Sequence, residues 1–199
     1  SALEAMLSKP AAAREKPAYL ELIEEESLLD IAAKKGNSKA LEMLMKKDPL
    51  AFQSAELGLT ALINAMKYQK GDIVNLLISH GVDINGHNSL ALKKAAELGL
   101  GDMATILLRN YAEVNPSKAK PQTSFKRLDD EVLPPLLMAV KNNHLEMVKL
   151  LVANGAKINV VSQRFGTAFD VAKRQNNLSI MQFLRMHGAQ SSKLLSVAH

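Results

Sequence analysis

Apolar residues recur at helical spacing in pairs of short segments along most of the chain. The first segment of a pair, such as "SLLDIAAKK" from Ser27, carries two adjacent small residues near its end. The second, such as "KALEMLMKK" from Lys39, has the i, i+3, i+4 apolar spacing of an amphipathic helix. The pattern predicts an all-α chain built from paired short helices.

Five such pairs follow one another. They begin at Ser27, Thr60, Leu90, Pro134 and Thr167, with 33 residues between the first two starts and 33 between the last two. Four pairs close in a related turn, "GVDIN", "YAEVN", "GAKIN" or "GAQSS". Each pair has an apolar face that it cannot cover alone, so we expect neighbouring pairs to stack.

The predicted helix ends carry the residues that helix ends require. Ser27, Thr60 and Thr167 are expected to cap helix N-termini, and Pro135 suits a first helical position. Three glycines that follow second helices are expected to be left-handed: Gly81, Gly155 and Gly188. Leu90 lacks a capping hydroxyl and Asp48 replaces the closing glycine of the first pair, so we expect a foldable but not hyperstable array.

These motifs together resemble the ankyrin repeat, whose familiar pattern is T-P-L-H-x-A-A, a second helix and then G-A-x-V-N. The resemblance covers residues 27 to about 190. It implies an all-α ankyrin-repeat solenoid of stacked helix-turn-helix units joined by β-turn loops. The family's usual histidine is replaced in every repeat, so its hydrogen bond to threonine is absent; the replacements are Asp30, Ile63, Lys93, Leu137 and Asp170.

The repeats leave two ends and one insertion to explain. We expect an N-terminal capping or partial-repeat helix with a linker over 1–26, a single repeat domain over 27–190 and a frayed tail over 191–199. A polar, charged insertion at 116–133 lengthens the third interval to 44 residues. Either this loop is functional, or it is a tolerated surface insertion. Because the chain starts with Ser1, we expect a fragment of a longer protein.

Composition narrows the class of protein. Apolar residues make up 47% of the chain, aromatic residues only 4%, and there is no cysteine, which excludes disulfides and thiolate metal sites. No apolar run approaches the length of a membrane helix, and no signal peptide is visible. We predict a monomer inside a cell, cytoplasmic or nuclear. The alternative is a bacterial protein secreted into a host cell.

The net charge of +5 is uneven. Residues 1–26 hold six Glu against three Lys or Arg, a balance of −3, which leaves +8 for the other 173 residues. This excess favours an acidic partner but is weak evidence for nucleic-acid binding. Stacking on bases usually needs exposed aromatic residues, and the three Tyr and five Phe fall mostly at packing positions.

The stretch "HGVDINGHN", from His80 to Asn88, could be a small metal site or a polar turn. His80 and His187 each precede a closing glycine, where histidine can bond the last helical carbonyls, and His144 opens a second helix. A calcium loop starting at Asp83 would need a bidentate Glu where Lys94 stands. The chain has no H-E-x-x-H or G-x-S-x-G motif. We therefore predict a turn, and a protein that is not an enzyme and holds no metal or cofactor.

The resemblance implies where a partner would bind: the concave surface of the first helices and the β-turn loops, or fingers, between repeats. The two residues after each small pair are the groove candidates: Lys34, Lys35, Lys67, Tyr68, Glu97, Leu98, Lys141, Asn142, Arg174 and Gln175. Candidates at the finger tips are Leu57, Leu59, His87, Asn88, Arg164 and Phe165. The insertion adds Lys118, Lys120, Lys126 and Arg127.

The groove candidates carry a net charge of +4, from five cationic residues and one anionic residue. We therefore predict a protein–protein interaction module that binds an acidic segment, with Tyr68 and Leu98 as apolar anchors. The alternatives are that the lysines only keep an exposed face soluble, that the chain is the targeting module of a larger enzyme or a bacterial effector, or that it binds nucleic acid weakly.

Overall fold

A computed structural model describes residues 27–47, 55–116 and 133–195 of the chain, which forms two compact units, 1–82 and 83–199. Within these described ranges the elements are α-helices, apart from one isolated antiparallel bridge between Ser162 and Gly166. The prediction of an all-α fold is confirmed. The predicted N-terminal segment 1–26, the end of the first repeat at Asp48 and the centre of the insertion lie outside the described residues.

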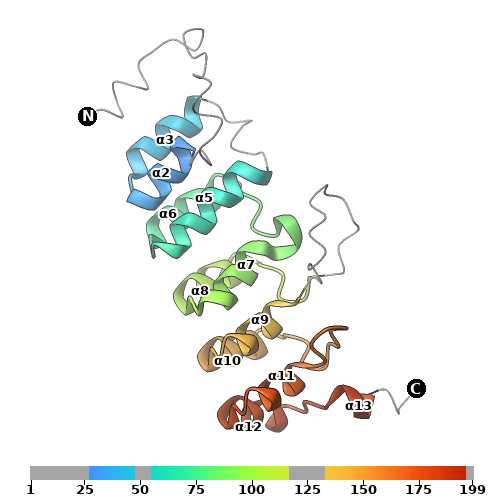
Figure 1. Ribbon diagram of the computed structural model, residues 1–199. Coiled ribbons are helices and arrows are strands. Elements are labelled where there is room, and N and C mark those ends of the chain that lie inside the picture. The colour runs from blue at the N-terminus through green and yellow to red at the C-terminus, as the bar shows by residue number, and fades with distance from the viewer. Residues whose placement is uncertain (1–26, 48–54, 117–132, 196–199) are drawn as a thin grey trace, which may run out of the picture. The chain divides into compact units, whose positions relative to one another are not determined.

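The described residues of unit 1 form two helix pairs. They are α2 (Leu28–Lys35) with α3 (Ser38–Lys47), and α5 (Ala55–Lys67) with α6 (Gly71–Ser79) (Figure 1). The first helices α2 and α5 pack against each other, and α3 contacts α6. Ala32 and Ala33 on α2 are at most 1% exposed. These small side chains allow the close approach of first helices that the sequence pattern predicts.

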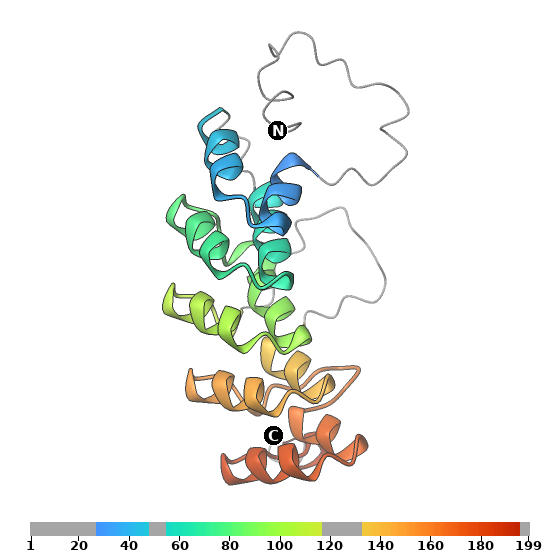
Figure 2. The ribbon, with the colours of Figure 1, turned by 90° about the vertical axis from the view of Figure 1, so that its left-hand side faces the viewer.

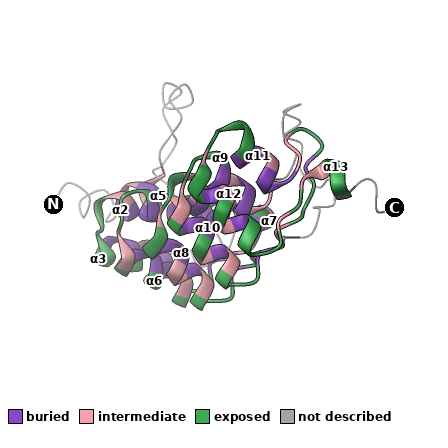
Figure 3. Cartoon of the chain, turned by 90° about the horizontal axis from the view of Figure 1, so that it is seen from below, coloured by how far each residue is buried: buried purple, intermediate pink, exposed green. Residues whose placement is uncertain are grey.

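Three helix pairs and a final helical turn make up the part of unit 2 that the structure describes. The pairs are α7 (Gly86–Leu98) with α8 (Gly101–Arg109), α9 (Pro135–Lys141) with α10 (Leu145–Ala153), and α11 (Ala168–Arg174) with α12 (Leu178–Met186); α13 is Ser192–Leu195. The pairs follow one another along the unit (Figure 2), with α9 between α7 and α11 and α10 between α8 and α12. Each first helix of the unit carries buried residues (purple in Figure 3), such as Ala95 on α7, Ala139 on α9 and Ala172 on α11. Stacking therefore supplies the core that no single pair has.

Two of the predicted helix caps are present, and each forms a capping box with an aspartate three residues further on. Ser27 and Thr167 each accept the backbone N–H three residues ahead, at 3.1 and 3.2 Å, while Asp30 and Asp170 bond back to the capping residue. These reciprocal capping boxes satisfy two orphan helix donors at once. The aspartates occupy the position where the family usually has histidine, so they replace its hydrogen bond with another. Pro135 opens α9 as predicted.

The predicted cap at Thr60 is wrong. Helix α5 begins at Ala55, so Thr60 is an exposed residue inside the helix. Leu57 and Leu59, predicted at a finger tip, are also helical; Leu57 is 40% exposed, whereas Leu59 is 3% exposed and belongs to the core. The apolar periodicity of α5 extends back through "AELGL", and this longer helix overrides the local capping signal.

At the end of each of these second helices, the residue before the glycine position forms a side-chain hydrogen bond to a carbonyl of the last turn. Nδ1 of His80 lies 2.9 Å from the carbonyl oxygen of Leu76, and Nδ1 of His187 lies 2.8 Å from that of Phe183. Asn110 and Asn154 donate through their side-chain amides to the carbonyl four residues back, both at 2.8 Å. The following glycines Gly81, Gly155 and Gly188 have φ between 82° and 87°. The predicted role of these histidines as helix-end residues is confirmed.

The asparagine that ends each turn joins adjacent pairs of unit 2. The side chain of Asn115 donates to the carbonyl of Gly155 at 2.8 Å and accepts from the N–H of Lys157 at 2.7 Å. Two other asparagines repeat this two-bond contact: Asn85 with Tyr111 and Glu113, and Asn159 with Gly188 and Gln190. In the predicted turn "GVDIN", Asp83 accepts the N–H of Asn85 at 3.0 Å. The polar residues of this stretch are therefore structural.

The start of α7 differs from the prediction that a helix begins at Leu90. His87, Asn88 and Ser89 have φ of 49°, 61° and 58°, a left-handed turn that precedes the right-handed helix. The side-chain nitrogen of Asn88 and the hydroxyl of Ser89 are buried without a hydrogen-bond partner. A local pattern cannot predict such a turn, because non-glycine residues rarely adopt it in succession.

Tyr111 occupies the position that is glycine in three other repeats. Its φ is 65°, and its side chain is 89% exposed, so the ring gains little from burial. We expect Tyr111→Gly to raise the free energy of unfolding by about 1 kcal/mol, because glycine removes the left-handed strain of a Cβ. Urea unfolding followed by circular dichroism measures this change. Tyr111→Ala, which keeps the Cβ, is the matched control and should change stability little; a loss of stability in Tyr111→Gly would contradict the argument.

Candidate partner-binding site

The predicted groove residues of unit 1 lie at the C-terminal ends of α2 and α5. Nζ of Lys34 stands 5.1 Å from the centre of the Tyr68 ring, and Tyr68 is 47% exposed. Lys35 and Lys67 are exposed beside them. Cations at these ends also complement the helix dipole, which accounts for part of their placement without any partner. We call these four residues the basic surface of unit 1.

At α7 the two groove positions differ in character. Glu97 pairs with Lys94 across 2.6 Å, so its charge is balanced within its own helix. Leu98 is 44% exposed. Nε2 of His144 lies 3.0 Å from the carbonyl oxygen of Glu97, which ties α7 to the start of α10 and gives His144 its predicted structural role.

The last finger of unit 2 is a tight hairpin. Ser162 and Gly166 exchange two backbone hydrogen bonds of 2.9 Å each, and residues 163–165 form its tip. Arg164 and Phe165 therefore lie at the tip of this finger, and their contact with a partner stays a prediction. The ring of Phe165 has Nζ of Lys141 at 5.1 Å and Cζ of Arg164 at 5.3 Å from its centre.

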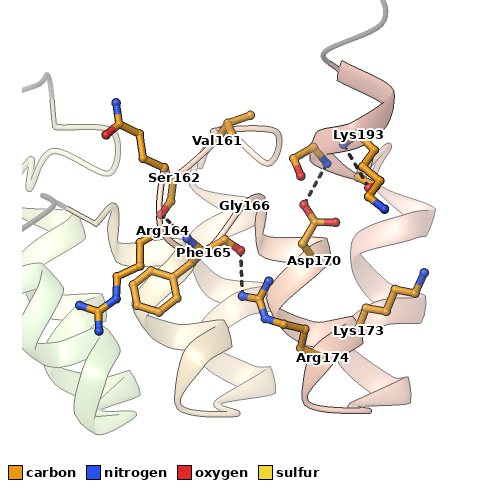
Figure 4. Close-up of a pocket in the computed structure, with 12 residues that line it drawn as sticks. Val161, Ser162, Arg164, Phe165, Gly166, Asp170, Lys173, Arg174 and Lys193 are labelled. Atoms are coloured by element: carbon orange, nitrogen blue, oxygen red, sulfur yellow. Dashed lines mark hydrogen bonds between the residues drawn. The ribbon is translucent and has the colours of Figure 1, made fainter.

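Groove positions and this finger come together in unit 2. The guanidinium of Arg174 donates to the carbonyl of Phe165 at 2.8 Å (Figure 4), and the side chain of Gln175 donates to the carbonyl of Lys141 at 2.6 Å. These contacts join residues that lie 9 and 34 positions apart along the chain. We call the resulting set the basic surface of unit 2: Lys141, Asn142, Arg164, Phe165, Arg174 and Gln175.

The other candidates do not join either surface. His87 and Asn88 lie in the left-handed turn before α7, where His87 is exposed and Asn88 is half-buried. The insertion residues Lys118, Lys120, Lys126 and Arg127 lie outside the described residues. Over the ranges that the structure describes, no group of three His, Asp or Glu is arranged to hold a metal ion. No described helix is long and apolar enough to cross a membrane.

The stacked pairs with their capped first helices agree with a comparison against protein families. Residues 29–118 match the model for ankyrin repeats in three copies, and residues 127–185 match the model for ankyrin repeats in many copies. The chain belongs to the ankyrin repeat family. Ankyrin repeats are generally protein–protein interaction modules, and the two matches identify no catalytic domain.

Two curated proteins are similar to this ankyrin array. "Ankyrin repeat and KH domain-containing protein mask-1" of Caenorhabditis elegans is 28% identical over 165 residues, which is 81% of this chain and 6% of that protein. "Putative ankyrin repeat protein R598" of Acanthamoeba polyphaga mimivirus is 28% identical over 104 residues, 45% of this chain and 34% of that protein. The array therefore spans about a third or less of the relatives it matches.

Beside the ankyrin groove positions lie residues that the repeat pattern does not predict as partner contacts. Lys173, Ser192 and Lys193 line a pocket together with Arg174 and the last finger. The sequence does mark Lys173 as unusual. It stands at the second position of the small pair, where the other first helices have a small or apolar residue such as Ala33. The sequence pattern does not predict a role for Ser192, because this residue lies in the predicted frayed tail. That prediction is wrong for residues 192–195, which form α13.

Asp170 holds this last segment in place. Its Oδ2 accepts the N–H of Thr167 at 3.0 Å and the N–H of Ser192 at 2.9 Å, while the hydroxyl of Thr167 donates to the carbonyl of Gln190 at 2.9 Å. Partial burial raises the pKa of the Asp170 carboxyl, but hydrogen bonds from Thr167, Ser192 and Ser191 outweigh it and hold that pKa well below its usual range. The C-terminal segment is anchored by a carboxylate that stays charged.

Proposed function

We propose that the chain is a non-catalytic interaction module that binds an acidic segment of a partner protein on its two basic surfaces. One observation carries the proposal: Lys141 and Arg164 lie beside the ring of Phe165, and Arg174 donates to the backbone carbonyl of the same residue. A cationic and aromatic cluster of this kind suits an acidic segment that also carries apolar groups.

Charge and exposure on each unit support the same partner. Lys35 and Lys67 on unit 1 and Lys141 and Arg174 on unit 2 are exposed. The single acidic groove position, Glu97, is already paired with Lys94. Electrostatic complementarity would therefore draw in an acidic partner and disfavour a basic one. Of the predicted apolar anchors, Tyr68 and Leu98 are 47% and 44% exposed, so both are accessible for contact.

A charge-reversal experiment tests the proposal. Partners are first captured with the wild-type chain, and the affinity of a captured partner is then measured for a variant with Lys34, Lys67, Lys141 and Arg174 changed to Glu. We expect a loss of at least about tenfold, because four attractive contacts become repulsive. Deleting residues 116–133 in parallel shows whether the insertion contributes.

The matched control reverses four exposed cations that lie outside both basic surfaces: Lys39, Lys46, Arg109 and Lys157. It changes the net charge by the same amount, while leaving both basic surfaces intact. If the control loses as much affinity as the test variant, only overall charge matters. Unchanged binding by the test variant would contradict the proposal. A role as the targeting module of a larger enzyme, and a location inside a cell, stay predictions.

A further inference from the structure

A depression of about 470 Å³ lies between the last finger, α11 and the segment 191–193. Figure 4 shows its walls: the finger on one side, the start of α13 on the other, and Asp170 between them. We call it the finger pocket. It lies beside the basic surface of unit 2 and shares Arg164, Phe165 and Arg174 with it.

Hydrogen bonds fix both walls of the finger pocket. The finger is closed by the bonds between Ser162 and Gly166 and held to α11 by Arg174. The opposite wall is held by Asp170 and Thr167, which bond Ser192 and Gln190. A site built on such contacts loses little conformational freedom when a ligand enters.

The finger pocket is rich in hydrogen-bond donors. Arg174 has five N–H donors, of which one goes to the carbonyl of Phe165, and its neighbour Lys173 is exposed. Asp170 is the one carboxylate in the lining, and its Oδ2 already accepts N–H groups from Thr167 and Ser192. Its negative charge is thereby compensated from within the protein. Four cations also line the pocket, Arg164, Lys173, Arg174 and Lys193, so its charge favours an anion.

We infer that the finger pocket binds a phosphorylated side chain, phosphoserine or phosphothreonine, carried by the acidic segment of the partner. The inference rests on the proposed function and names the group that the segment presents. The side chains of Arg174 and Lys173 point away from each other, Arg174 toward the finger and Lys173 toward the opposite wall (Figure 4), so the lining is cationic on both sides. A phosphate monoester carries about −1.5 to −2 charges and three acceptor oxygens, so this net positive lining attracts it more strongly than a carboxylate, which carries one charge and two oxygens.

The test is an NMR titration of the whole chain with N-acetyl-O-phosphoserine amide, followed through the amide signals of Phe165, Gly166 and Ser192. N-acetyl-glutamate amide and inorganic phosphate are titrated in parallel. We expect phosphoserine to bind at least about tenfold more tightly than the glutamate derivative, because it carries the larger negative charge and more acceptor oxygens. Inorganic phosphate should shift the same three signals.

The variants are Arg174→Ala, Lys173→Ala and, as a matched control, Arg109→Ala, an exposed arginine on α8. Arg174→Ala should weaken phosphoserine binding about tenfold, and Lys173→Ala several-fold. Arg174→Lys should restore part of the loss, because it keeps the charge but not the planar fork. Arg109→Ala should bind as the wild type does.

Equal affinity for phosphoserine and glutamate would overturn the inference, as would an equal effect of Arg109→Ala and Arg174→Ala. The failures of the two proposals can be told apart. If charge reversal abolishes partner binding but phosphoserine shows no preference for the finger pocket, only the inference is wrong. If the pocket prefers phosphoserine but charge reversal leaves partner binding unchanged, the proposed basic surfaces are wrong.

Discussion

Replacement of Gly99 by alanine is expected to lower the free energy of unfolding by about 3 kcal/mol. Gly99 ends α7 with a φ of 68°, so any Cβ there is strained. An added Cβ would also lie 2.6 Å from Nδ1 of His144, and the ring would have to leave the carbonyl of Glu97. Strain, overlap and a lost hydrogen bond act together at one position.

Urea unfolding of Gly99→Ala and Gly155→Ala separates these causes. Gly155 has a φ of 83°, and an added Cβ would meet nothing within 4 Å, so only the backbone strain applies. We expect Gly155→Ala to cost about 1 to 2 kcal/mol. Combining Gly99→Ala with His144→Ala should cost less than the sum of the two single changes, because removing the ring relieves the overlap. Equal losses in the two glycine variants would show that the overlap with His144 has no effect.

The second large effect is expected at Asp170. Asp170→Ala should lower the free energy of unfolding by about 2 kcal/mol, because it leaves the N–H groups of Thr167 and Ser192 without their charged acceptor. Amide hydrogen exchange at Ser192 should become faster, since this bond ties α13 to α11. Urea unfolding and exchange at pH 7 measure the two changes.

The contribution of Asp170 should also depend on pH. Folding lowers the pKa of this carboxyl below its usual range, so its stabilising effect is complete well above about pH 4, the unfolded value, and is lost as the pH falls below it. Asp170→Asn, which cannot ionise, should lack this part of the pH dependence. Asp102→Asn, at an exposed aspartate in the first turn of α8, is the matched control. An Asp170→Asn variant whose stability falls between pH 5 and pH 3 as steeply as the wild type would contradict the assignment.

Helix ends could be predicted where the required chemistry is local. Ser27 and Thr167 cap helices, Pro135 opens one and Gly155 follows one, because each acts on backbone groups within a few residues. Thr60 carried the same local signal and misled, since the residues before it extend α5 by another turn. A capping side chain stabilises a helix by about 1 kcal/mol. The burial of apolar side chains along a longer helix contributes more free energy than that.

The sequence predicts which residues occupy equivalent positions in the candidate site, but not which of them contact one another. The repeat pattern places Lys141 and Arg174 at equivalent positions, and the structure finds both exposed at the ends of their first helices. That Phe165 would lie beside Lys141 depends on the shape of the finger, which is closed by backbone bonds between Ser162 and Gly166. Such bonds leave no trace in side-chain periodicity.

By itself the sequence determined the paired helices, the order of the repeats, the left-handed glycines and the family, because each follows from spacing repeated several times along the chain. Only the tertiary structure decided the left-handed turn at His87–Ser89, the bonds of Asn115 to the next pair and the pocket that joins Arg174 to Ser192. The physical reason is the range of the interactions. Periodicity records which side of a helix is buried, whereas these features depend on contacts between segments that stacking alone brings together.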